Sequence, residues 1–334
     1  MKIYAFDVRE DEKEYFRYFA EKFECEVNLT TERLCMESVG ECKGYDGVTI
    51  LGNSKVDCEM IDRFCELGIK FLSTRTIGYN NIDIAYAKEK GIRVCNAQYA
   101  PDSVADFTIM MMLMALRKYK PALYRQNVND FSLSGLIGKT MRSMTVGVIG
   151  TGQIGTAVIE SLQGFGCRVL AYNRSESKHV KEMAEYVDLD TLYRESDMIS
   201  IHLPLNDSTR KMISAGSMTN MKDGVILINT ARGELMDVKS LIWGIETCKI
   251  GARAMDVFEN ENDIYHTNHV NDIITNQEMA YLRQFPNVIL TQHMAFYTES
   301  AVSEMVECAV EGLKTMMEGN TYKCEIKVGS SHVA

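Results

Sequence analysis

The sequence has no hydrophobic run that is long enough to cross a membrane. Its longest apolar run, residues 109–116, contains eight residues, whereas a transmembrane helix needs about 18 or more. The first ten residues contain no apolar core of the kind that a secretory signal requires. Both absences lead us to expect a cytoplasmic protein that has no membrane partner.

An excess of basic residues is also absent. The 36 lysines and arginines are outnumbered by 46 aspartates and glutamates, which gives a formal net charge of −10. Because such a chain has no overall attraction for phosphate groups, we expect no nucleic-acid partner. The ten cysteines include no CxxC pair, so reduced thiols are a better interpretation than a disulfide framework.

What is present is the composition of a globular protein. The chain is 46% hydrophobic and 25% charged, which argues against disorder, collagen and low-complexity scaffolds. Its 334 residues are about twice the length of a typical single domain. We therefore expect two domains.

Two successive parts of the chain alternate strand-like and helix-like segments. In the first part, apolar strand-like segments alternate with amphipathic stretches and lie at 2–8, 47–51, 70–73 and 92–97. In the second part, the strand-like segments lie at 145–149, 168–172, 198–203, 225–229, 251–256 and 288–291. This alternation is typical of parallel sheets that are covered by helices on both faces. The sequence therefore predicts an α/β protein with two doubly wound domains.

The second domain is expected to be inserted into the first. Ser103 and Asp106 form a variant of the capping box, which predicts the start of a helix at this point. The helix that follows is apolar nearly all round, as expected of a helix that is buried between domains. The last helix carries one apolar stripe and is expected to return to the N-terminal domain. We expect a discontinuous domain at 1–101 plus 298–334 and a second domain at 102–297.

A glycine-rich turn predicts a dinucleotide site in the second domain. Gly150, Gly152 and Gly155 follow the strand at 145–149 and precede a helical stretch. Gly150 allows a tight turn, Gly152 lets a pyrophosphate approach the backbone, and Gly155 permits close packing of helix on strand. Because the free amides of the helix N-terminus suit a phosphate, we expect a Rossmann-like domain that binds NAD(P)H.

The residues after the next strand bear on the choice of cofactor. Asn173 stands where an acidic residue usually binds the ribose 2′-hydroxyl of NAD. The missing carboxylate removes a repulsion toward a 2′-phosphate, which Arg174 and Ser175 have the chemistry to bind. We therefore expect NADPH to be accepted. The alternative is that Asn173 binds the ribose of NAD and Arg174 is only solvated.

Polar side chains follow three of the predicted strands. Arg232, Asp256 and His293 stand at or just beyond strand ends, and Glu261 lies five residues after Asp256. Because ligands of such sheets bind outside the carboxyl ends of the strands, we expect these side chains to converge. An arginine binds a carboxylate, and a histidine held by an acidic partner donates a proton to a carbonyl that accepts hydride. The set favours the reduction of a 2-oxo acid.

Structural roles for these and other residues stay open. An arginine after a strand is often a surface residue, and an aspartate such as Asp256 often caps a helix. His202 lies in an apolar run and is predicted to be a core histidine. His266 and His269 have a spacing that metal sites use, but no third ligand is evident, so we expect no metal. The segment 258–285 either shapes the pocket or is a surface excursion.

Seven motifs follow one another along the chain to about Glu325: STRTIGYNNID, NAQYAPDSVADFT, MTVGVIGTGQIG, HLPLNDST, MKDGVILINTARGELMD, AMDVFENE and PNVILTQHMAFYTESAV. In content and order these motifs resemble those of the D-isomer-specific 2-hydroxyacid dehydrogenase family. Within that family the chain is similar to D-lactate dehydrogenases, including the vancomycin-resistance type. It is also similar to (R)-2-hydroxyisocaproate and aromatic-lactate dehydrogenases.

The resemblance implies a flavodoxin-like substrate domain with an inserted coenzyme domain, through which two copies form a homodimer. It implies that Arg232 binds substrate, that Glu261 is the partner of His293, and that His293 is the acid/base. Implied substrate contacts are Tyr99, the backbone amides of Ile77 and Gly78, and Phe296. Implied cofactor contacts are Gln153 and Ile154 at the pyrophosphate, and Leu203, Pro204, Thr230, Ala231 and Asp256 around the nicotinamide.

We therefore predict a D-2-hydroxyacid dehydrogenase that interconverts a small 2-oxo acid and its 2-hydroxy acid. The first expectation is a D-lactate dehydrogenase that uses pyruvate. The alternatives are a branched-chain or aromatic 2-hydroxyacid dehydrogenase, and a non-catalytic nucleotide-sensing protein similar to co-repressors. The presence of Arg232, Glu261 and His293 favours an enzyme, and the Tyr99 and Phe296 stretches argue against a phosphoglycerate or formate dehydrogenase.

Overall fold

The computed structural model describes residues 1–261 and 264–327, which form two compact units. The first unit comprises residues 1–100 together with the chain from Tyr297, and the second comprises residues 101–296. The second unit is thus an insertion in the first. The boundaries expected from the sequence lie one residue later, and their residues 262–263 and 328–334 are outside the described residues.

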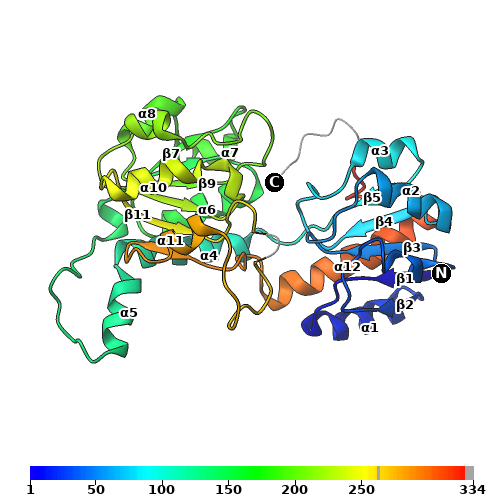
Figure 1. The fold of residues 1–334 in the computed structure, drawn as a ribbon. Helices are drawn as coiled ribbons and strands as arrows, with labels where there is room; N and C mark the ends of the chain where they lie inside the picture. The colour runs from blue at the N-terminus through cyan, green and yellow to red at the C-terminus, as the bar shows by residue number, and fades with distance from the viewer. Residues whose placement is uncertain (262–263, 328–334) are drawn as a thin grey trace. The chain divides into compact units, whose positions relative to one another are not determined.

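The sheet of the first unit contains five parallel strands in the order β2-β1-β3-β4-β5 (Figure 1). The strands are β1 (Lys2–Ala5), β2 (Glu26–Leu29), β3 (Gly47–Ile50), β4 (Phe71–Thr74) and β5 (Arg93–Cys95). This is the strand order of flavodoxin-like sheets, and it reverses direction between β1 and β3. The flavodoxin-like prediction is confirmed.

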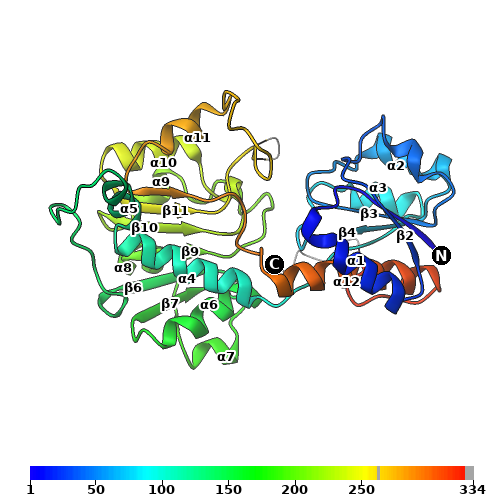
Figure 2. The same cartoon turned by 90° about the horizontal axis from the view of Figure 1, so that it is seen from below.

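Helices cover both faces of this sheet. On one face lie α1 (Lys13–Lys22) and α12 (Glu299–Met317), and on the other lie α2 (Cys58–Leu67) and α3 (Ile84–Glu89), with the short helices η1 (Glu10–Glu12) and η2 (Val39–Cys42) in the connections (Figures 1 and 2). Phe16 and Phe19 of α1 pack with Val306 and Leu313 of α12 in one core. Because both faces are covered, strands such as β3 are buried along their whole length.

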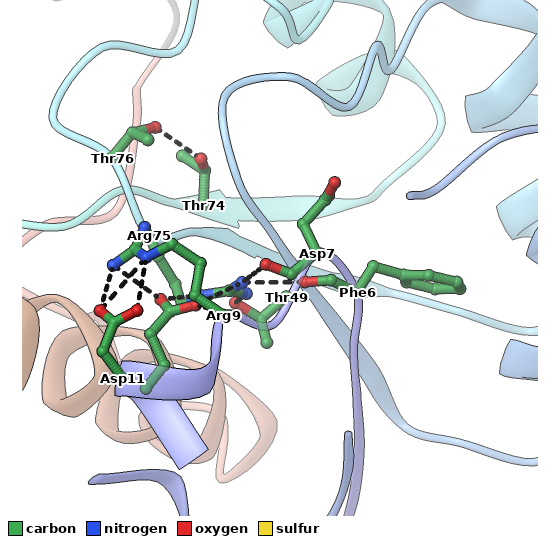
Figure 3. Close-up of polar contacts among 9 residues, drawn as sticks. Phe6, Asp7, Arg9, Asp11, Thr49, Thr74, Arg75 and Thr76 are labelled. Atoms are coloured by element: carbon green, nitrogen blue, oxygen red, sulfur yellow. Dashed lines mark hydrogen bonds and ion pairs between the residues drawn. The ribbon is translucent and has the colours of Figure 1, made fainter. Parts of the chain in front are cut away.

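A buried ion pair joins the carboxyl ends of three strands of the first unit (Figure 3). Arg75 and Glu12 are fully buried, and Nε of Arg75 lies 2.9 Å from Oε1 of Glu12. The same guanidinium donates to the Phe6 carbonyl (2.8 Å) and to the Thr49 hydroxyl (3.3 Å). The pair therefore fixes the chain directly after β4, where residues 76–78 begin.

The second sheet contains seven parallel strands in the order β12-β11-β10-β9-β6-β7-β8. They are β6 (Thr145–Ile149), β7 (Arg168–Tyr172), β8 (Glu185–Tyr186), β9 (Met198–Ile201), β10 (Val225–Asn229), β11 (Ile250–Met255) and β12 (Val288–Leu290). The strand order reverses between β6 and β9, the kind of position where Rossmann-like sheets bind dinucleotides. The prediction of two doubly wound units is confirmed.

Helices also cover both faces of the second sheet (Figure 2). One face is covered by α4 (Asp102–Leu116), α6 (Gln153–Gln163) and α7 (Lys178–Lys181), and the other by α8 (Leu189–Glu195), α9 (Ala215–Thr219), α10 (Val238–Glu246) and α11 (Gln277–Leu282). Two short helices, η3 (Met141–Ser143) and η4 (Gly233–Leu235), lie in connections. Helix α5 (Tyr119–Asn127) and the loop after it project from this unit (Figure 1).

The predicted start of helix α4 is two residues too late, because the N-cap residue is Pro101 and not Ser103. The helix begins at Asp102, and Ser103 therefore lies inside its first turn instead of capping it. Pro101 already has helical backbone angles (φ −67°, ψ −14°), because its ring fixes φ in that range. Among the described residues, no helix combines the length and the apolar character that a bilayer span needs.

Candidate active site

The glycine-rich turn joins β6 to α6 at the point where the strand order reverses. Gly150 has a φ of +94°, a conformation that glycine adopts without strain. A side chain at Gly150 would collide with the carbonyl of His202, and one at Gly155 would collide with the carbonyl of Gly150. The turn therefore needs glycine at both positions, for the reasons that the motif predicts.

The N-terminus of α6 is the part of this turn that suits a phosphate. Gly152 is the N-cap residue, and Gln153 and Ile154 form the start of the helix. Because the first amides of a helix have no partner within it and carry partial positive charge, they bind anions well. These three residues fit the pyrophosphate of a dinucleotide.

The chain after β7 carries a cation and no carboxylate at the position expected to bind the ribose. Asn173 donates from its side-chain amide to the carbonyl of Ser175 (2.9 Å). Arg174 and Ser175 are exposed. Within residues 1–261 and 264–327, no carboxylate forms an ion pair with Arg174, so its guanidinium faces solvent.

The residues expected around the nicotinamide follow β9 and β10. Leu203, Pro204 and Ala231 are partly exposed, whereas Thr230 is buried. The hydroxyl of Thr230 lies 2.9 Å from that of Thr108 on α4. Since the Thr108 hydroxyl donates to a backbone carbonyl of its own helix, the Thr230 hydroxyl must be the donor to it. The Thr230 side chain thus anchors the end of β10 to α4.

A buried asparagine shapes the turn that presents Arg232. The Asn229 side chain accepts from the amide of Ala231 (3.0 Å) and donates to the carbonyl of Arg232 (2.8 Å). Arg232 has an extended backbone (φ −145°) and a partly buried side chain. A side chain at Gly233 would collide with the backbone of Phe258. Glycine here lets the Arg232 turn pack directly against the chain that carries Glu261.

The loop after β12 holds His293 in an unusual conformation, and Asp256 anchors that loop. His293 has a φ of +53°, and its amide donates to the carbonyl of Asp256 (2.7 Å). The buried carboxylate of Asp256 accepts from the amides of Met294 (3.0 Å) and Ala295 (2.7 Å) and from the Thr291 hydroxyl (2.6 Å). Asp256 is therefore a loop anchor and does not cap a helix.

His293 and Glu261 form a hydrogen-bonded pair. Nδ1 of His293 pairs with Oε1 of Glu261, while Oε2 of Glu261 accepts from the amide of Phe258 (2.5 Å). The side chains are 31% and 16% exposed, respectively. Because a carboxylate only accepts, Nδ1 carries a proton, and Nε2 is the ring atom that can exchange a proton with a ligand.

The strand register brings Arg232 and His293 to the same edge of the second sheet. Strand β11 lies between β10 and β12, and its Met255 is in register with Asn229 on one side and Leu290 on the other. Since neighbouring strands are about 4.8 Å apart, the two outer strands end about 10 Å apart, on either side of Asp256. The sequence-predicted residues Arg232, Asp256, Glu261 and His293 are thus neighbours in the second unit.

In the first unit, the loop after β4 has its carbonyls bonded and its amides available. Asn96 donates to the Ile77 carbonyl (2.7 Å), and the Thr76 hydroxyl donates to the Gly78 carbonyl (2.7 Å). Among the described residues, none accepts a hydrogen bond from the amide of Ile77 or Gly78. Two adjacent amides without acceptors suit a carboxylate.

Two side chains of α12 hold the loop that carries Tyr99. The amide of Ala100 donates to the Glu304 carboxylate (2.8 Å), and the thiol of Cys308 donates to the Gln98 carbonyl (3.3 Å). Glu304 and Cys308 are four residues apart and therefore lie on the same face of the helix. The two contacts hold the residues directly before and after Tyr99. Neither residue stands out in the sequence.

Comparison with known proteins identifies the family. Residues 109–295 match the model of the NAD binding domain of the D-isomer specific 2-hydroxyacid dehydrogenases. This chain belongs to that family. It is 44% identical to the aromatic 2-oxoacid reductase of Clostridium sporogenes strain PA 3679, covering 94% of this chain and 96% of the relative.

Further relatives and solved structures are also similar over almost the whole chain. The D-specific alpha-keto acid dehydrogenase of Enterococcus faecium is 38% identical, covering 92% of this chain and 95% of the relative. The crystal structure of the D-lactate dehydrogenase with NAD+ from Lactobacillus jensenii is similar with a TM-score of 0.84 and 31% identity, covering 98% of this chain and 100% of that one. The family and fold expected from the sequence are confirmed.

Within the segment 258–285 of this dehydrogenase, the described residue His266 contacts the His293 loop. Nε2 of His266 lies 3.1 Å from the carbonyl oxygen of His293. The ring centroids of His266, His293 and Phe296 are 6.2–6.5 Å apart in all three pairs. The segment therefore belongs to the surroundings of the site. The sequence pointed to His266 only through its spacing from His269.

The other two histidines considered in the sequence, His269 and His202, have different partners. His269 pairs with Asp272 (2.9 Å), and the described part of the chain holds no group of three or more metal-ligating side chains. His202 is buried, with Nε2 2.8 Å from the Ser200 hydroxyl. Burial lowers the pKa of His202 to about 4. The prediction that His202 is a core histidine is confirmed.

Proposed function

We propose that the protein reduces a 2-oxo acid to the (R)-2-hydroxy acid. The observation that carries this proposal is the His293–Glu261 pair at the carboxyl edge of the second sheet, where only β11 lies between the strands that end before His293 and before Arg232. Arg232 binds the carboxylate and polarises the neighbouring carbonyl. His293 donates the proton on Nε2 to the carbonyl oxygen as C2 gains hydride. A bound nicotinamide cofactor supplies that hydride.

The resemblance suggests further residues for the proposed recognition of substrate. The available amides of Ile77 and Gly78 are proposed to bind the substrate carboxylate, together with Tyr99. Phe296 is proposed to close the pocket next to His293, since the two rings are 6.5 Å apart. These roles rest on the resemblance and on the local geometry of each residue.

The side chain of the substrate is the finer part of the proposal. Pyruvate is the first candidate, as for a D-lactate dehydrogenase. Branched and aromatic 2-oxo acids are the second, because a relative that is 44% identical is named an aromatic 2-oxoacid reductase. One methylene in an apolar pocket changes specificity by only about 1–3 kcal/mol, so an assay must decide between them.

The test is an assay of NAD(P)H oxidation with pyruvate, 4-methyl-2-oxopentanoate and phenylpyruvate, followed by chiral analysis of the product. We expect (R)-2-hydroxy acid from at least one of them.

His293→Ala should lower kcat about a thousandfold through loss of the proton donor, and Arg232→Ala should act mainly on substrate KM. His179→Ala, which changes an exposed histidine bonded to Glu160, should behave as wild type. A wild-type protein that is inactive on all three acids would contradict the proposal and favour a nucleotide sensor.

We infer that NADPH is accepted as well as NADH. Arg174 is exposed without an acidic partner among the described residues, and Asn173 presents no carboxylate to a 2′-phosphate. The measurement is the ratio of kcat/KM for NADPH over NADH, and a ratio far below one would contradict the inference. Arg174→Ala should lower that ratio, because it removes the charged donor for the phosphate.

We also propose that the protein works as a cytoplasmic homodimer formed through the second unit. Helix α5 and the loop after it expose Tyr124, Phe131, Leu133 and Ile137. A groove of about 580 Å³ on the same unit is lined mostly by apolar side chains of α4, such as Met110. An apolar surface of this kind is unusual for a monomer, and a two-fold pairing of copies would bury it on both.

A further inference from the structure

We propose that His266 is a positioning residue for His293. Its Nε2–H group holds the His293 loop through the His293 carbonyl. This inference rests on the proposed function, in which His293 is the proton donor. It gives the segment 258–285 a role in the reaction, where the sequence leaves open whether the segment is only a surface excursion.

The conformation of His293 requires support from its surroundings. A residue other than glycine in the left-handed region is strained by about 1–2 kcal/mol, and His293 has a φ of +53°. Such a conformation persists only where neighbouring contacts determine it. The contacts on both sides of His293 therefore set the direction in which its imidazole points.

Both backbone groups of His293 have partners. Its amide donates to the Asp256 carbonyl (2.7 Å), and its carbonyl lies 3.1 Å from Nε2 of His266. Because a carbonyl only accepts, Nε2 of His266 must carry a proton. Within residues 1–261 and 264–327, no other donor bonds this carbonyl. His266 is thus the partner that completes the support of the backbone at this residue.

The same segment also holds the side chain of His293. Glu261 pairs with Nδ1 of His293, and the amides of Ile264 and Tyr265 donate to the Glu261 carbonyl (both 2.9 Å). Ile264 and Tyr265, which bond Glu261, directly precede His266 in the sequence. Glu261 fixes the ring of His293, while His266 fixes its peptide. The two contacts act at opposite ends of the same residue and together define where Nε2 of His293 stands.

The His266 ring also packs near the rings of His293 and Phe296, so a variant must separate packing from hydrogen bonding. His266→Phe keeps a ring and removes the donor. His266→Gln keeps a donor at about the reach of Nε2 and removes the ring. The matched control is His269→Phe, the same substitution three residues later, at a side chain that pairs with Asp272 instead.

The experiment compares kcat and the two KM values of these variants with the 2-oxo acid that the wild type prefers. We expect His266→Phe to lower kcat about tenfold, the loss typical of one well-placed hydrogen bond, with the KM for NADH unchanged. His266→Gln should recover most of that loss. His269→Phe should match the wild type. An unchanged kcat in His266→Phe, or a His266→Gln variant no better than His266→Phe, would overturn the proposal.

Amide hydrogen exchange supplies a readout that does not depend on turnover. We expect peptides covering residues 291–296 to exchange faster in His266→Phe than in the wild type and in His269→Phe, because the loop loses a contact. Unchanged exchange in His266→Phe would count against the hydrogen bond. If the wild type reduces no 2-oxo acid, the proposed function fails, while the exchange measurement still decides whether His266 holds the loop.

Discussion

Asp256 shows how a single buried carboxylate sets the geometry of a neighbouring loop. Its two oxygens accept from the Thr291 hydroxyl and from the amides of Met294 and Ala295. A carboxylate has enough lone pairs for all three donors and no donor of its own. The resemblance implies a contact of this residue with the nicotinamide, whereas the hydrogen bonds show that its carboxylate anchors the loop of His293.

We predict that Asp256→Asn lowers kcat by about 10- to 100-fold. Asparagine offers one acceptor oxygen, and its amide group would face backbone N–H donors, so at least one buried donor loses its partner, at a cost of about 1–3 kcal/mol. Steady-state kinetics and urea unfolding measure the two effects. Thr291→Val removes only one of the donors and should have a smaller effect on both. Wild-type kcat in Asp256→Asn would show that His293 does not need this anchor.

His202 makes the stability of the second unit depend on pH. Burial lowers its pKa to about 4, whereas an unfolded histidine titrates near 6.5. Between these values the unfolded chain binds a proton that the folded chain does not, so stability is complete above about pH 6.5 and is lost as the pH falls toward 4. The expected contribution is a loss of about 2 kcal/mol between pH 7 and pH 5.

His202→Gln should remove this part of the acid sensitivity. The test is the free energy of unfolding in urea at pH 7 and at pH 5, compared between wild type and variant. Glutamine keeps a polar group for Ser200 but does not titrate. His179→Gln changes an exposed histidine and should keep the wild-type difference between the two pH values. An equal difference in His202→Gln would assign the acid sensitivity to other groups.

At the scale of elements, the strands that the sequence predicts are those that are buried in the fold. Strand β10 is buried at all five residues, VILIN, and such a continuous apolar run is readily recognised. Strand β2 is an edge strand, EVNL, in which exposed and partly buried residues alternate, and its sequence carries no apolar run that predicts a strand. Two-residue β8 is also missed. Central strands are predictable because both faces of the sheet are covered, whereas edge strands depend on neighbours that the sequence does not show.

The buried pair Arg75–Glu12 connects η1 to the ends of β1, β3 and β4, and its loss should affect the whole first unit. Arg75→Met takes the closest cation from the buried Glu12 carboxylate, which then keeps only its contacts with the Arg9 amide (2.9 Å) and guanidinium (3.6 Å). Breaking a buried pair in this way destabilises by about 3–5 kcal/mol. Adding Glu12→Leu should restore only part of this loss, because the Phe6 carbonyl still lacks its donor. Urea unfolding of the two single variants and the double variant measures the coupling.

The control for this cycle is an exposed ion pair of the same unit. Arg63 and Glu66 are both largely exposed on α2, and exposed pairs contribute little to stability. Arg63→Met should therefore leave the unfolding midpoint nearly unchanged. A loss in Arg75→Met no larger than that in Arg63→Met would mean that the buried pair does not hold these strand ends together.

At the scale of the whole molecule, the sequence predicts strand ends better than it predicts loop contacts. Arg232 and His293 are found from the rule that ligands bind beyond the carboxyl ends of parallel strands. Glu304 and His266 act through one hydrogen bond each to a backbone group. Such a bond leaves no periodic pattern and no fixed spacing. The spacing of His266 and His269 even suggested metal chemistry, which the pairing of His269 with Asp272 does not support.

The last prediction concerns the proposed homodimer, which would bury apolar surface that the folded chain leaves exposed. Leu133 and Ile137 are 84% and 85% exposed, next to Phe131 on the projecting loop after α5. Burying apolar area of this kind stabilises by about 25 cal/mol per Å², and a carboxylate in such an interface stays unpaired. Phe131→Glu combined with Leu133→Glu should therefore convert a dimer of twice 37.8 kDa into a monomer of 37.8 kDa.

Light scattering on the purified protein measures the mass directly, and circular dichroism checks that the variant is folded. Ile273→Glu supplies the matched control, because Ile273 is equally apolar and 91% exposed but lies outside the projecting loop. Its mass should equal that of the wild type. If the wild type is a monomer, or if Ile273→Glu dissociates the dimer while the loop variant does not, the contact between copies lies elsewhere. A dimer lost only in the loop variant would explain why this loop carries so many uncovered apolar side chains.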